Sequence, residues 1–256
     1  TNFSRICLSK TWIFVEWARF RWIIRRTDIL SNLKPNLPKN LEEISSTIPH
    51  PEGITLDDKD NIFVSSASTG NIFLVSKNDI KVHANTKGRP LGIAYSKKLN
   101  SLIAADAARK SVLRISLGNA SISVLCREYE DMDLNGPSDL IITENEEIIF
   151  TDPIRNPFPN PCISPVYKIP KSNKIETFLT DLAFPSGIAN IDSKVYISET
   201  RANRLVVMED NQSDEIIEPQ MFRRFADPGY PDGITVDDDK NIYRSEEHTS
   251  ELQSPC

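Results

Sequence analysis

PEGITLDDKDNIFVSS, residues 51–66, decides the fold, because four similar stretches follow it along the chain. Each has a Pro-x-Gly or Pro-x-Asp turn, an apolar run, a polar turn and a second β-rich run. The other copies are RPLGIAYSKKLNSLIAAD (89–106), GPSDLIITENEEIIFTDP (136–153), FPSGIANIDSKVYISET (184–200) and YPDGITVDDDKNIYRS (230–245). Their aligned prolines are 39, 47, 48 and 46 residues apart. Short strands repeating at this period predict the blades of a β-propeller.

Two further β-rich runs follow within a unit, as at Asn71–Val75 and Ile80–His83 in the first copy, so a blade has four antiparallel strands. Helical periodicity is absent from this region. A β-sandwich with coincidental spacing is the weaker alternative. We therefore expect an all-β, six-bladed β-propeller that is incomplete here, with about five blades and the last one partial.

The expected propeller domain spans residues 41–243. Residues 41–45 resemble the fourth run of a unit, so they are expected to form the outer strand of the closing blade, with no inner strands before them. Residues 1–40 hold all three tryptophans among basic residues, and we interpret them as an N-terminal extension outside the repeat. Residues 244–256 read as the translation of a sequencing-library adapter, expected to pack against nothing except by extending the strand that ends at Tyr243.

The amino-acid composition argues against some classes of binding partner. The formal net charge is −6, and the basic residues of 1–40 make the remaining body more acidic still. An acidic body argues against nucleic acid, which binds Lys and Arg. Charges interrupt every apolar run of membrane-spanning length, so no membrane partner is expected. The four cysteines show no zinc-ligand spacing and no disulfide framework, which favours a cytoplasmic location.

The residue after each aligned proline precedes the innermost strand of its blade. Rotation about the propeller axis relates these positions, so they are expected to form a ring around the central channel. Two carboxylates and two hydroxyls directed at one axis could bind a hard divalent cation. The same residue types are common in turns, so the spacing alone leaves both interpretations open. The ring consists of Glu52, Leu91, Ser138, Ser186 and Asp232.

The motifs from Pro51 to Tyr243 resemble those of the senescence marker protein, gluconolactonase and luciferin-regenerating enzyme family. The resemblance implies a divalent cation, calcium, zinc or magnesium, bound by Glu in the first motif, Asn in the third and fourth, and Asp in the fifth. Glu52 and Asp232 match this metal-binding pattern. Ser138 and Ser186 stand where the family has asparagine. Because a serine hydroxyl is shorter and a weaker ligand than an amide carbonyl, both are expected to bind the metal weakly or through water.

The resemblance also implies a reaction: metal-dependent hydrolysis of a small-molecule lactone or related ester. Asp232, near both metal and substrate, is the expected catalytic residue, which orients or deprotonates the attacking water. Arg89, Glu199 and Arg201 are candidates for substrate binding at the mouth of the channel. Two further carboxylates match family residues and are interpreted as turn and strand-cap residues: Asp139 and Asp152.

Two other functions stay open. GRPLGIAYSKKLNSLIAADA (88–107) and the Phe-Thr-Asp at 150–152 also resemble strictosidine-synthase-like propellers, whose synthase activity rests on a glutamate in a late blade. A third possibility is a non-catalytic binding propeller that has lost its metal site. The two serines in place of asparagine, Ser138 and Ser186, favour this last alternative.

Overall fold

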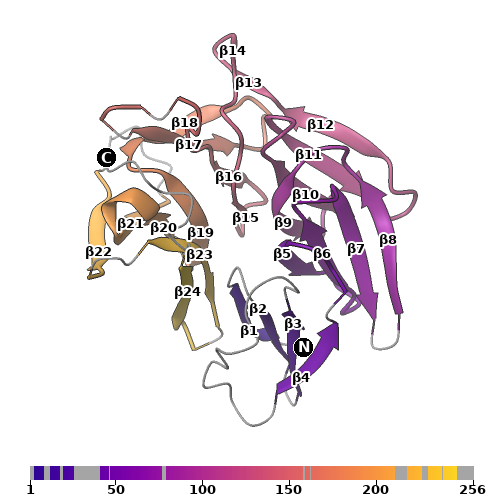
Figure 1. The fold of residues 1–256 in the computed structure, drawn as a ribbon. Helices are drawn as coiled ribbons and strands as arrows, with labels where there is room; N and C mark the ends of the chain where they lie inside the picture. The colour runs from indigo at the N-terminus through magenta and orange to yellow at the C-terminus, as the bar shows by residue number, and fades with distance from the viewer. Residues whose placement is uncertain are drawn as a thin grey trace.

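The computed structural model describes residues 47–76, 79–157, 159–161, 163–210, 218–226, 230–237 and 239–245 in full, and the backbone of 3–8, 12–17, 20–25, 41–45 and 246. In this part of the chain the regular elements are strands, apart from one 3-10 turn, η1 (Thr200–Ala202), and no helix is long and apolar enough to span a membrane. Four-stranded sheets follow one another around a central axis (Figure 1). The predicted all-β propeller is confirmed.

Four complete blades cover residues 51–224, each an antiparallel meander whose first strand is nearest the axis. Blade 1 contains β5 (Pro51–Leu56), β6 (Ile62–Ser66), β7 (Asn71–Ser76) and β8 (Asp79–Asn85). Blade 2 contains β9 (Pro90–Ser96), β10 (Ser101–Asp106), β11 (Ser111–Ser116) and β12 (Ile122–Cys126), and is followed by the hairpin of β13 (Glu128–Tyr129) and β14 (Met132–Asp133). Blade 3 contains β15 (Leu140–Ile142), β16 (Ile148–Thr151), β17 (Ser164–Ile169) and β18 (Glu176–Leu182). Blade 4 contains β19 (Pro185–Ile191), β20 (Lys194–Glu199), β21 (Arg204–Glu209) and β22 (Gln220–Arg224).

Blade 5 is represented by two strands, β23 (Pro231–Val236) and β24 (Ile242–Glu246). The strand predicted to end at Tyr243 therefore continues, and Ser245 within it is buried. The Arg244 guanidinium lies 4.1 Å from the ring centroid of Phe225, so this residue makes a contact that the adapter interpretation did not foresee. Residues 247–256 lie outside the described residues.

A further sheet lies between blade 5 and blade 1, with β1 next to both β23 and β5 (Figure 1). The expectation that residues 41–45 have no inner strands before them is wrong. They do form an outer strand, but it pairs in parallel with β3. The physical reason is local: FSRICL, WIFVEW and FRWIIR are rich in β-branched and aromatic residues, which favour strands. The sheet consists of β1 (Phe3–Leu8), β2 (Trp12–Trp17), β3 (Phe20–Arg25) and β4 (Leu41–Ser45).

The apolar core is divided among the interfaces between neighbouring blades. Phe63 of blade 1 packs with Leu102 and Leu113 of blade 2, and Ile103 of blade 2 packs with Phe150 of blade 3. Both faces of the inner strands are covered in this way. Burying each large side chain contributes about 1.5–3 kcal/mol relative to leaving it exposed, so each blade depends on its neighbours for stability.

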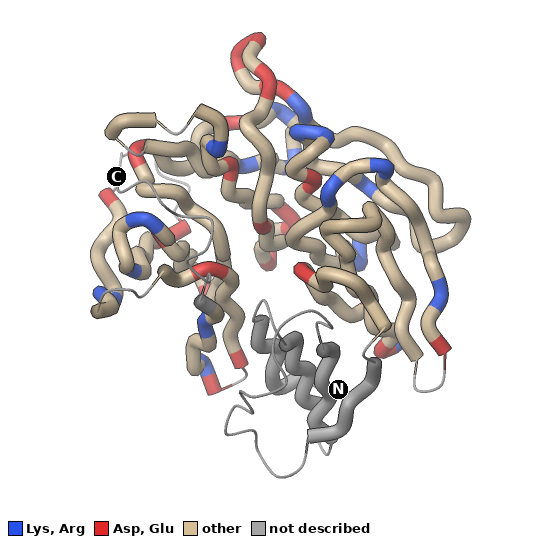
Figure 2. Tube along the Cα trace, in the orientation of Figure 1, with Lys and Arg blue, Asp and Glu red and all other residues tan. Residues whose placement is uncertain are grey.

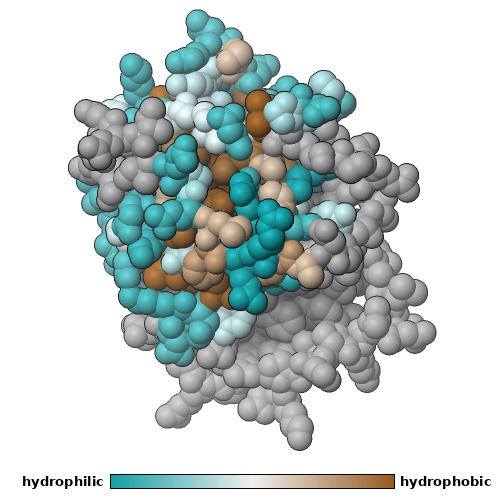
Figure 3. All heavy atoms as spheres, turned by 90° about the vertical axis from the view of Figure 1, so that its left-hand side faces the viewer, coloured by the Kyte–Doolittle hydropathy of each residue, from teal (hydrophilic) through white to brown (hydrophobic). Residues whose placement is uncertain are grey.

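The outermost strands face solvent. In β22 all five residues are exposed, and Met221 and Phe222 are the large apolar ones among them. Figure 3, which views the molecule from the side of blade 4, shows apolar residues interspersed with hydrophilic ones. The ring of Phe222 packs edge-on against Tyr196, with the centroids 5.1 Å apart. Part of the apolar surface of this strand is therefore used within its own blade.

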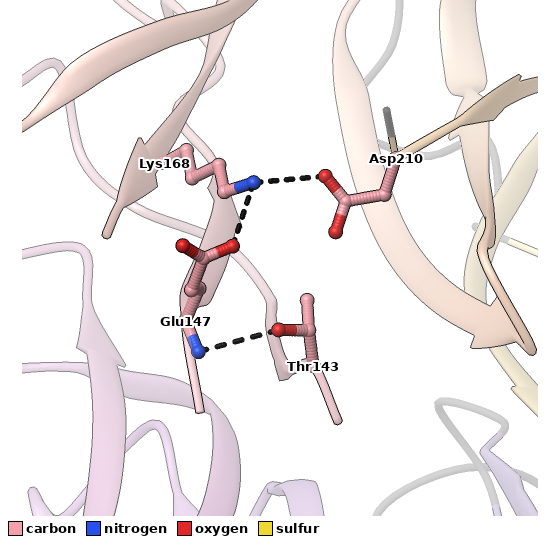
Figure 4. Close-up of polar contacts among 4 residues, drawn as sticks. All are labelled: Thr143, Glu147, Lys168 and Asp210. Carbon is pink, nitrogen blue, oxygen red and sulfur yellow. Dashed lines mark hydrogen bonds and ion pairs between the residues drawn. The ribbon is translucent and has the colours of Figure 1, made fainter. Parts of the chain in front are cut away.

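A buried ion cluster joins blades 3 and 4 (Figure 4). The Lys168 ammonium on β17 lies 2.8 Å from a carboxylate oxygen of Glu147 and 2.8 Å from one of Asp210, which follows β21. Burial disfavours the charged form of Lys168, but its hydrogen bonds to the two carboxylates and their charges outweigh that cost and raise its pKa. Because Lys168 contacts both partners at once, the cluster fixes the position of blade 4 relative to blade 3.

Near the axis, a hydroxyl on the second strand of a blade links that blade to the next one. The Gly53 N–H donates to Ser65 Oγ (2.7 Å), and Ser65 Oγ donates to the carbonyl oxygen of Leu91 in blade 2 (2.5 Å). A buried backbone donor and a buried backbone acceptor are thus satisfied by one side chain. Blades 3 and 4 use equivalent hydroxyls: Thr151 Oγ1 donates to Ser186 O (2.7 Å), and Ser198 Oγ donates to Asp232 O (2.5 Å).

Blade 2 makes the same connection without a hydroxyl. Ala105 occupies the position in blade 2 that Ser65 occupies in blade 1. Ala104, the residue before it, pairs with Ile93 on the first strand, as Val64 pairs with Ile54. Here the Gly92 N–H donates directly to the carbonyl oxygen of Ser138 in blade 3, at 2.9 Å. The carbonyl groups of the ring residues in blades 2 to 5 are therefore all bonded to the preceding blade.

We expect Ser65→Ala to lower the free energy of unfolding by about 1–3 kcal/mol, because it leaves the buried Gly53 N–H and the Leu91 carbonyl without this bond. Urea denaturation followed by fluorescence measures the change. Ser123→Ala, on an exposed position of β12, is the matched control and should stay within about 0.5 kcal/mol of the wild type. Equal stability of the two variants would show that the hydroxyl link contributes nothing.

Candidate functional site

A cavity of about 100 Å³ lies on the axis, where the innermost strands begin. Its lining includes Arg89 together with all five predicted ring residues, which come from five successive blades. The structure thus brings together side chains that are up to 180 residues apart in sequence. The ring residues are Glu52, Leu91, Ser138, Ser186 and Asp232.

A third carboxylate, Asp139, also lines the cavity. It occupies the second position after the aligned proline, where the other four blades have glycine. Its side chain accepts hydrogen bonds from the N–H groups of Leu140 (2.9 Å) and of Ile188 in blade 4 (3.2 Å). Burial raises the pKa of Asp139 to about 7, the two N–H groups oppose this rise, and the negative charges of Asp232 and Glu52 add to it.

Glycine is required at the equivalent position of blades 1 and 4. A Cβ atom on Gly53 would lie 2.4 Å from the carbonyl oxygen of Leu91, and one on Gly187 would lie 2.4 Å from that of Asp232. Both distances are far below van der Waals contact. The innermost strands of neighbouring blades therefore approach each other more closely than any side chain would allow, and this close approach draws the ring residues together.

Acidic residues gather around the axis. Figure 2 shows acidic positions at the central ends of the innermost segments of the ring. Like charges this close to one another are unfavourable unless a cation or a proton compensates them. Oxygen donors of this type are the ones that a hard divalent cation prefers, so the donor chemistry of Glu52 and Asp232 fits such an ion. The side chains of the described residues do not form a ready-made cluster of three acidic, histidine or cysteine ligands.

The two serines of the ring differ in their surroundings. Ser138 is half-buried at the cavity wall. Ser186 is only 2% exposed, and its hydroxyl lies 2.6 Å from Thr200 Oγ1 and 3.0 Å from Ser198 Oγ. A metal ion would have to compete with these hydrogen bonds for the Ser186 hydroxyl. Direct ligation by Ser138 is therefore easier than ligation by Ser186.

The hydroxyl cluster of Ser186, Ser198 and Thr200 supports the backbone of blade 5. Thr200 Oγ1 donates to the carbonyl oxygen of Pro231 at 2.7 Å, and Ser198 Oγ donates to that of Asp232 at 2.5 Å. Two successive carbonyl groups are fixed in this way at the start of β23. The cluster thus determines where the predicted catalytic residue, Asp232, enters the cavity wall.

The three predicted substrate-binding residues lie in different environments. Arg89 is exposed and lines the cavity. Arg201 does not line the cavity, and its guanidinium carbon lies 5.9 Å from the ring centroid of Phe184. Glu199 is fully buried away from the cavity: one oxygen accepts from the Ala183 N–H (2.8 Å) and the other pairs with Arg204. Of the three, the structure brings only Arg89 to the cavity.

Glu199 belongs to a set of carboxylates at the end of the second strand that hold the loop before the aligned proline. In blade 3, Asp152 accepts hydrogen bonds from the backbone N–H groups of Asn135 and Gly136, both at 2.8 Å. In blade 2, Asp106 accepts from the Arg89 N–H at 2.8 Å. The position of Glu199 in the repeat therefore explains its burial and gives it a structural role.

Three residues at the cavity were missed by sequence reasoning: Arg155, Phe184 and Ser245, the last of which falls in the predicted adapter-derived tail. Phe184 directly precedes an aligned proline, and the repeat could have identified it. Arg155 lies in the loop after β16, outside the repeated motif. Its Nη1 donates to the carbonyl oxygens of Gly136 and Pro153, and no sequence period predicts such a contact.

Comparisons with solved structures find the same fold in proteins of different function. A gluconolactonase from Xanthomonas campestris is 21% identical, with 77% of this chain and 69% of that chain covered and a TM-score of 0.67. A luciferin-regenerating enzyme is 15% identical, with 76% and 68% covered and a TM-score of 0.63. A chain of a nidogen/laminin complex is 15% identical, with 77% and 72% covered and a TM-score of 0.64. At these identities the likeness shows the fold alone.

A family model covers most of the chain. The model described as the SMP-30/Gluconolactonase/LRE-like region matches residues 50–253. A search of curated proteins finds no match. The matched range contains all the repeats, the ring residues and the cavity, which confirms the resemblance drawn from the motifs. The chain therefore belongs to the SMP-30/gluconolactonase/LRE-like family.

Proposed function

We propose that this protein is a metal-dependent hydrolase of lactones or related esters. The observation that carries the proposal is the meeting of Glu52 and Asp232, together with Asp139, in one cavity on the propeller axis. The family includes gluconolactonase-like lactonases, and its members often bind divalent metals. Carboxylates that line one cavity are suited to metal-assisted hydrolysis of a small molecule.

Glu52 and Asp232 would bind the cation (calcium, zinc or magnesium), because two carboxylates balance a divalent charge. Ser138 would add a neutral oxygen, directly or through water. When bound, the cation supplies Lewis-acid polarisation of the carbonyl group that is attacked. Ser186 contributes through its hydrogen bonds to the neighbouring blade rather than as a strong ligand.

Asp232 is the proposed general base. Its carboxylate is half-buried at the cavity, and its carbonyl group is fixed by the hydroxyl cluster. It accepts a proton from the attacking water as the oxygen of that water bonds to the carbonyl carbon. The C–O bond of the lactone then breaks, and the proton passes to the departing alkoxide, so that the product is a hydroxy acid.

A second candidate function is a non-catalytic binding propeller. The specific observation in its favour is that the Ser186 hydroxyl is occupied by Thr200 and Ser198, which weakens one of the predicted metal ligands. The same fold occurs in a chain of a nidogen/laminin complex, which is an assembly of proteins. Metal binding separates the two candidates, because a scaffold that has lost its site needs no cation.

The first test is calorimetric titration of the chelator-treated protein with calcium, zinc and magnesium. We expect at least one cation to bind with a dissociation constant below about 1 mM, and Glu52→Gln or Asp232→Asn to weaken it at least 10-fold by removing a charged ligand. Asp232→Asn should also abolish lactone hydrolysis, followed by acid release. Asp133→Asn, at an exposed position of β14, should leave both unchanged. No heat from any cation at millimolar concentration would favour the binding scaffold.

A second test uses the raised pKa of Asp139. An unfolded aspartate has a pKa of about 3.9, so between about pH 4 and pH 7 the folded protein binds a proton that the unfolded chain does not. Stability must then fall as the pH rises through this window. In chelator, we expect the melting temperature of the wild type to drop from pH 5 to pH 7.5 more steeply than that of Asp139→Asn. Asp133→Asn should keep the wild-type slope, and equal slopes for all three proteins would contradict the raised pKa.

A further inference from the structure

The residues that directly precede the aligned prolines occupy equivalent positions in the five blades and thus form a second ring around the axis. Two of them, Arg89 of blade 2 and Phe184 of blade 4, line the cavity. Between them, blade 3 has Gly136, with a φ of +140° that residues with a side chain rarely adopt. The second ring consists of His50, Arg89, Gly136, Phe184 and Tyr230.

Arg155 fills the place that Gly136 leaves without a side chain. A Cβ atom built on Gly136 would lie 3.2 Å from Arg155 Nη1, and that nitrogen donates to the carbonyl oxygens of Gly136 and Pro153. The guanidinium carbon lies 5.6 Å from the ring centroid of Phe184, within the range of a cation–π contact. These contacts hold a half-buried guanidinium at the cavity wall.

The charge of Arg155 also acts on Asp152, whose pKa is raised by burial and lowered by hydrogen bonds from Asn135 and Gly136 and by this charge. The Asp152 carboxylate accepts three hydrogen bonds from Asn135 and Gly136. The Asp152 carboxylate therefore stabilises the loop before Pro137. Arg155, in contrast, lies at the cavity wall, where a bound molecule can reach it.

The charged side chains at the cavity come from different blades. Arg89 and Arg155 belong to blades 2 and 3, and Glu52 and Asp232 belong to blades 1 and 5, on either side of the N-terminal sheet (Figure 1). The remaining carboxyl at the cavity, Asp139 of blade 3, accepts hydrogen bonds from two backbone N–H groups. An anionic group entering the cavity is repelled by the carboxylates and attracted to the two guanidinium groups.

We propose that Arg155 and Arg89 form an anion subsite, and that the substrate is a lactone or ester bearing a separate carboxylate or phosphate group. The reaction in this proposal rests on the proposed hydrolase function. A guanidinium binds either anion through paired N–H donors. With the anion held at blades 2 and 3, the lactone group is directed toward Glu52 and Asp232. The two arginines thus set both the class of substrate and its orientation.

The test compares three lactones: glucono-1,5-lactone, which is neutral, 6-phosphoglucono-1,5-lactone and glucaro-1,4-lactone, which carries a carboxylate. We expect kcat/KM to be at least 10-fold higher for one of the two anionic lactones than for the neutral one. Arg155→Met should lower kcat/KM for that anionic lactone by about 10- to 100-fold, the range for a lost charge-assisted hydrogen bond. Hydrolysis of the neutral lactone should change less than about 3-fold, and Arg155→Lys should recover part of the loss. Comparing the two anionic lactones shows whether the subsite prefers a phosphate or a carboxylate group.

The matched control is Arg127→Met, because Arg127 is an exposed arginine remote from the cavity lining, and it should behave as the wild type. Arg89→Met, at an exposed position, provides a second variant should Arg155→Met fail to fold, as judged by its melting curve. Equal losses on neutral and anionic lactones in Arg155→Met, or no preference for an anion in the wild type, would overturn the subsite.

A binding measurement separates this proposal from the hydrolase function. Inorganic phosphate and glucuronate are titrated calorimetrically into the wild type and Arg155→Met. If no lactone is hydrolysed but an anion binds the wild type at least 10-fold more tightly than the variant, the hydrolase proposal fails and the subsite stands. If the neutral lactone is hydrolysed and neither anion binds, the subsite fails and the hydrolase proposal stands.

Discussion

The hydrogen bond from one blade to the ring residue of the next is the interaction on which the centre of this molecule depends. Ser65, Thr151 and Ser198 each bridge the backbone of two blades, and the Gly92 N–H makes the bond directly where blade 2 has alanine. Because each bond ends on the carbonyl group of a ring residue, it sets where that residue enters the cavity. Rigid support of this kind is what a site built from distant segments requires.

The close approach of the blades positions the ring residues, but it also brings negatively charged side chains near one another. The ring draws Glu52 and Asp232 toward a common cavity, and Asp139 adds a third carboxylate where its neighbours have glycine. Burial is the main cause of the raised pKa of Asp139, and the negative charges of Asp232 and Glu52 add to the rise. A bound cation or a retained proton would offset the repulsion, so the repulsion between the carboxylates and the proposed metal binding have the same electrostatic origin.

The interfaces between the blades, further from the axis, also hold the blades in position around the cavity. Apolar clusters fill them, and Lys168 joins blades 3 and 4 through two carboxylates at once. The fold itself is shared with a gluconolactonase, a luciferin-regenerating enzyme and a chain of a nidogen/laminin complex. What distinguishes one propeller of this type from another is therefore the identity of the few side chains around the axis, where this cavity has Arg155 and Arg89 beside its carboxylates.

The sequence by itself determined the blades and the ring, because a repeat of constant geometry makes equivalent positions visible as a period. Glu52 and Asp232 could be assigned to one cavity on that ground alone. Only the tertiary structure decided which way the side chains point: the Ser186 hydroxyl bonds to blade 4 and blade 5, and Glu199 is buried against Ala183 and Arg204. It also placed Arg155 beside Gly136 and paired residues 41–45 with an earlier strand. These contacts join non-equivalent segments, and a period carries no information about partners that occur only once.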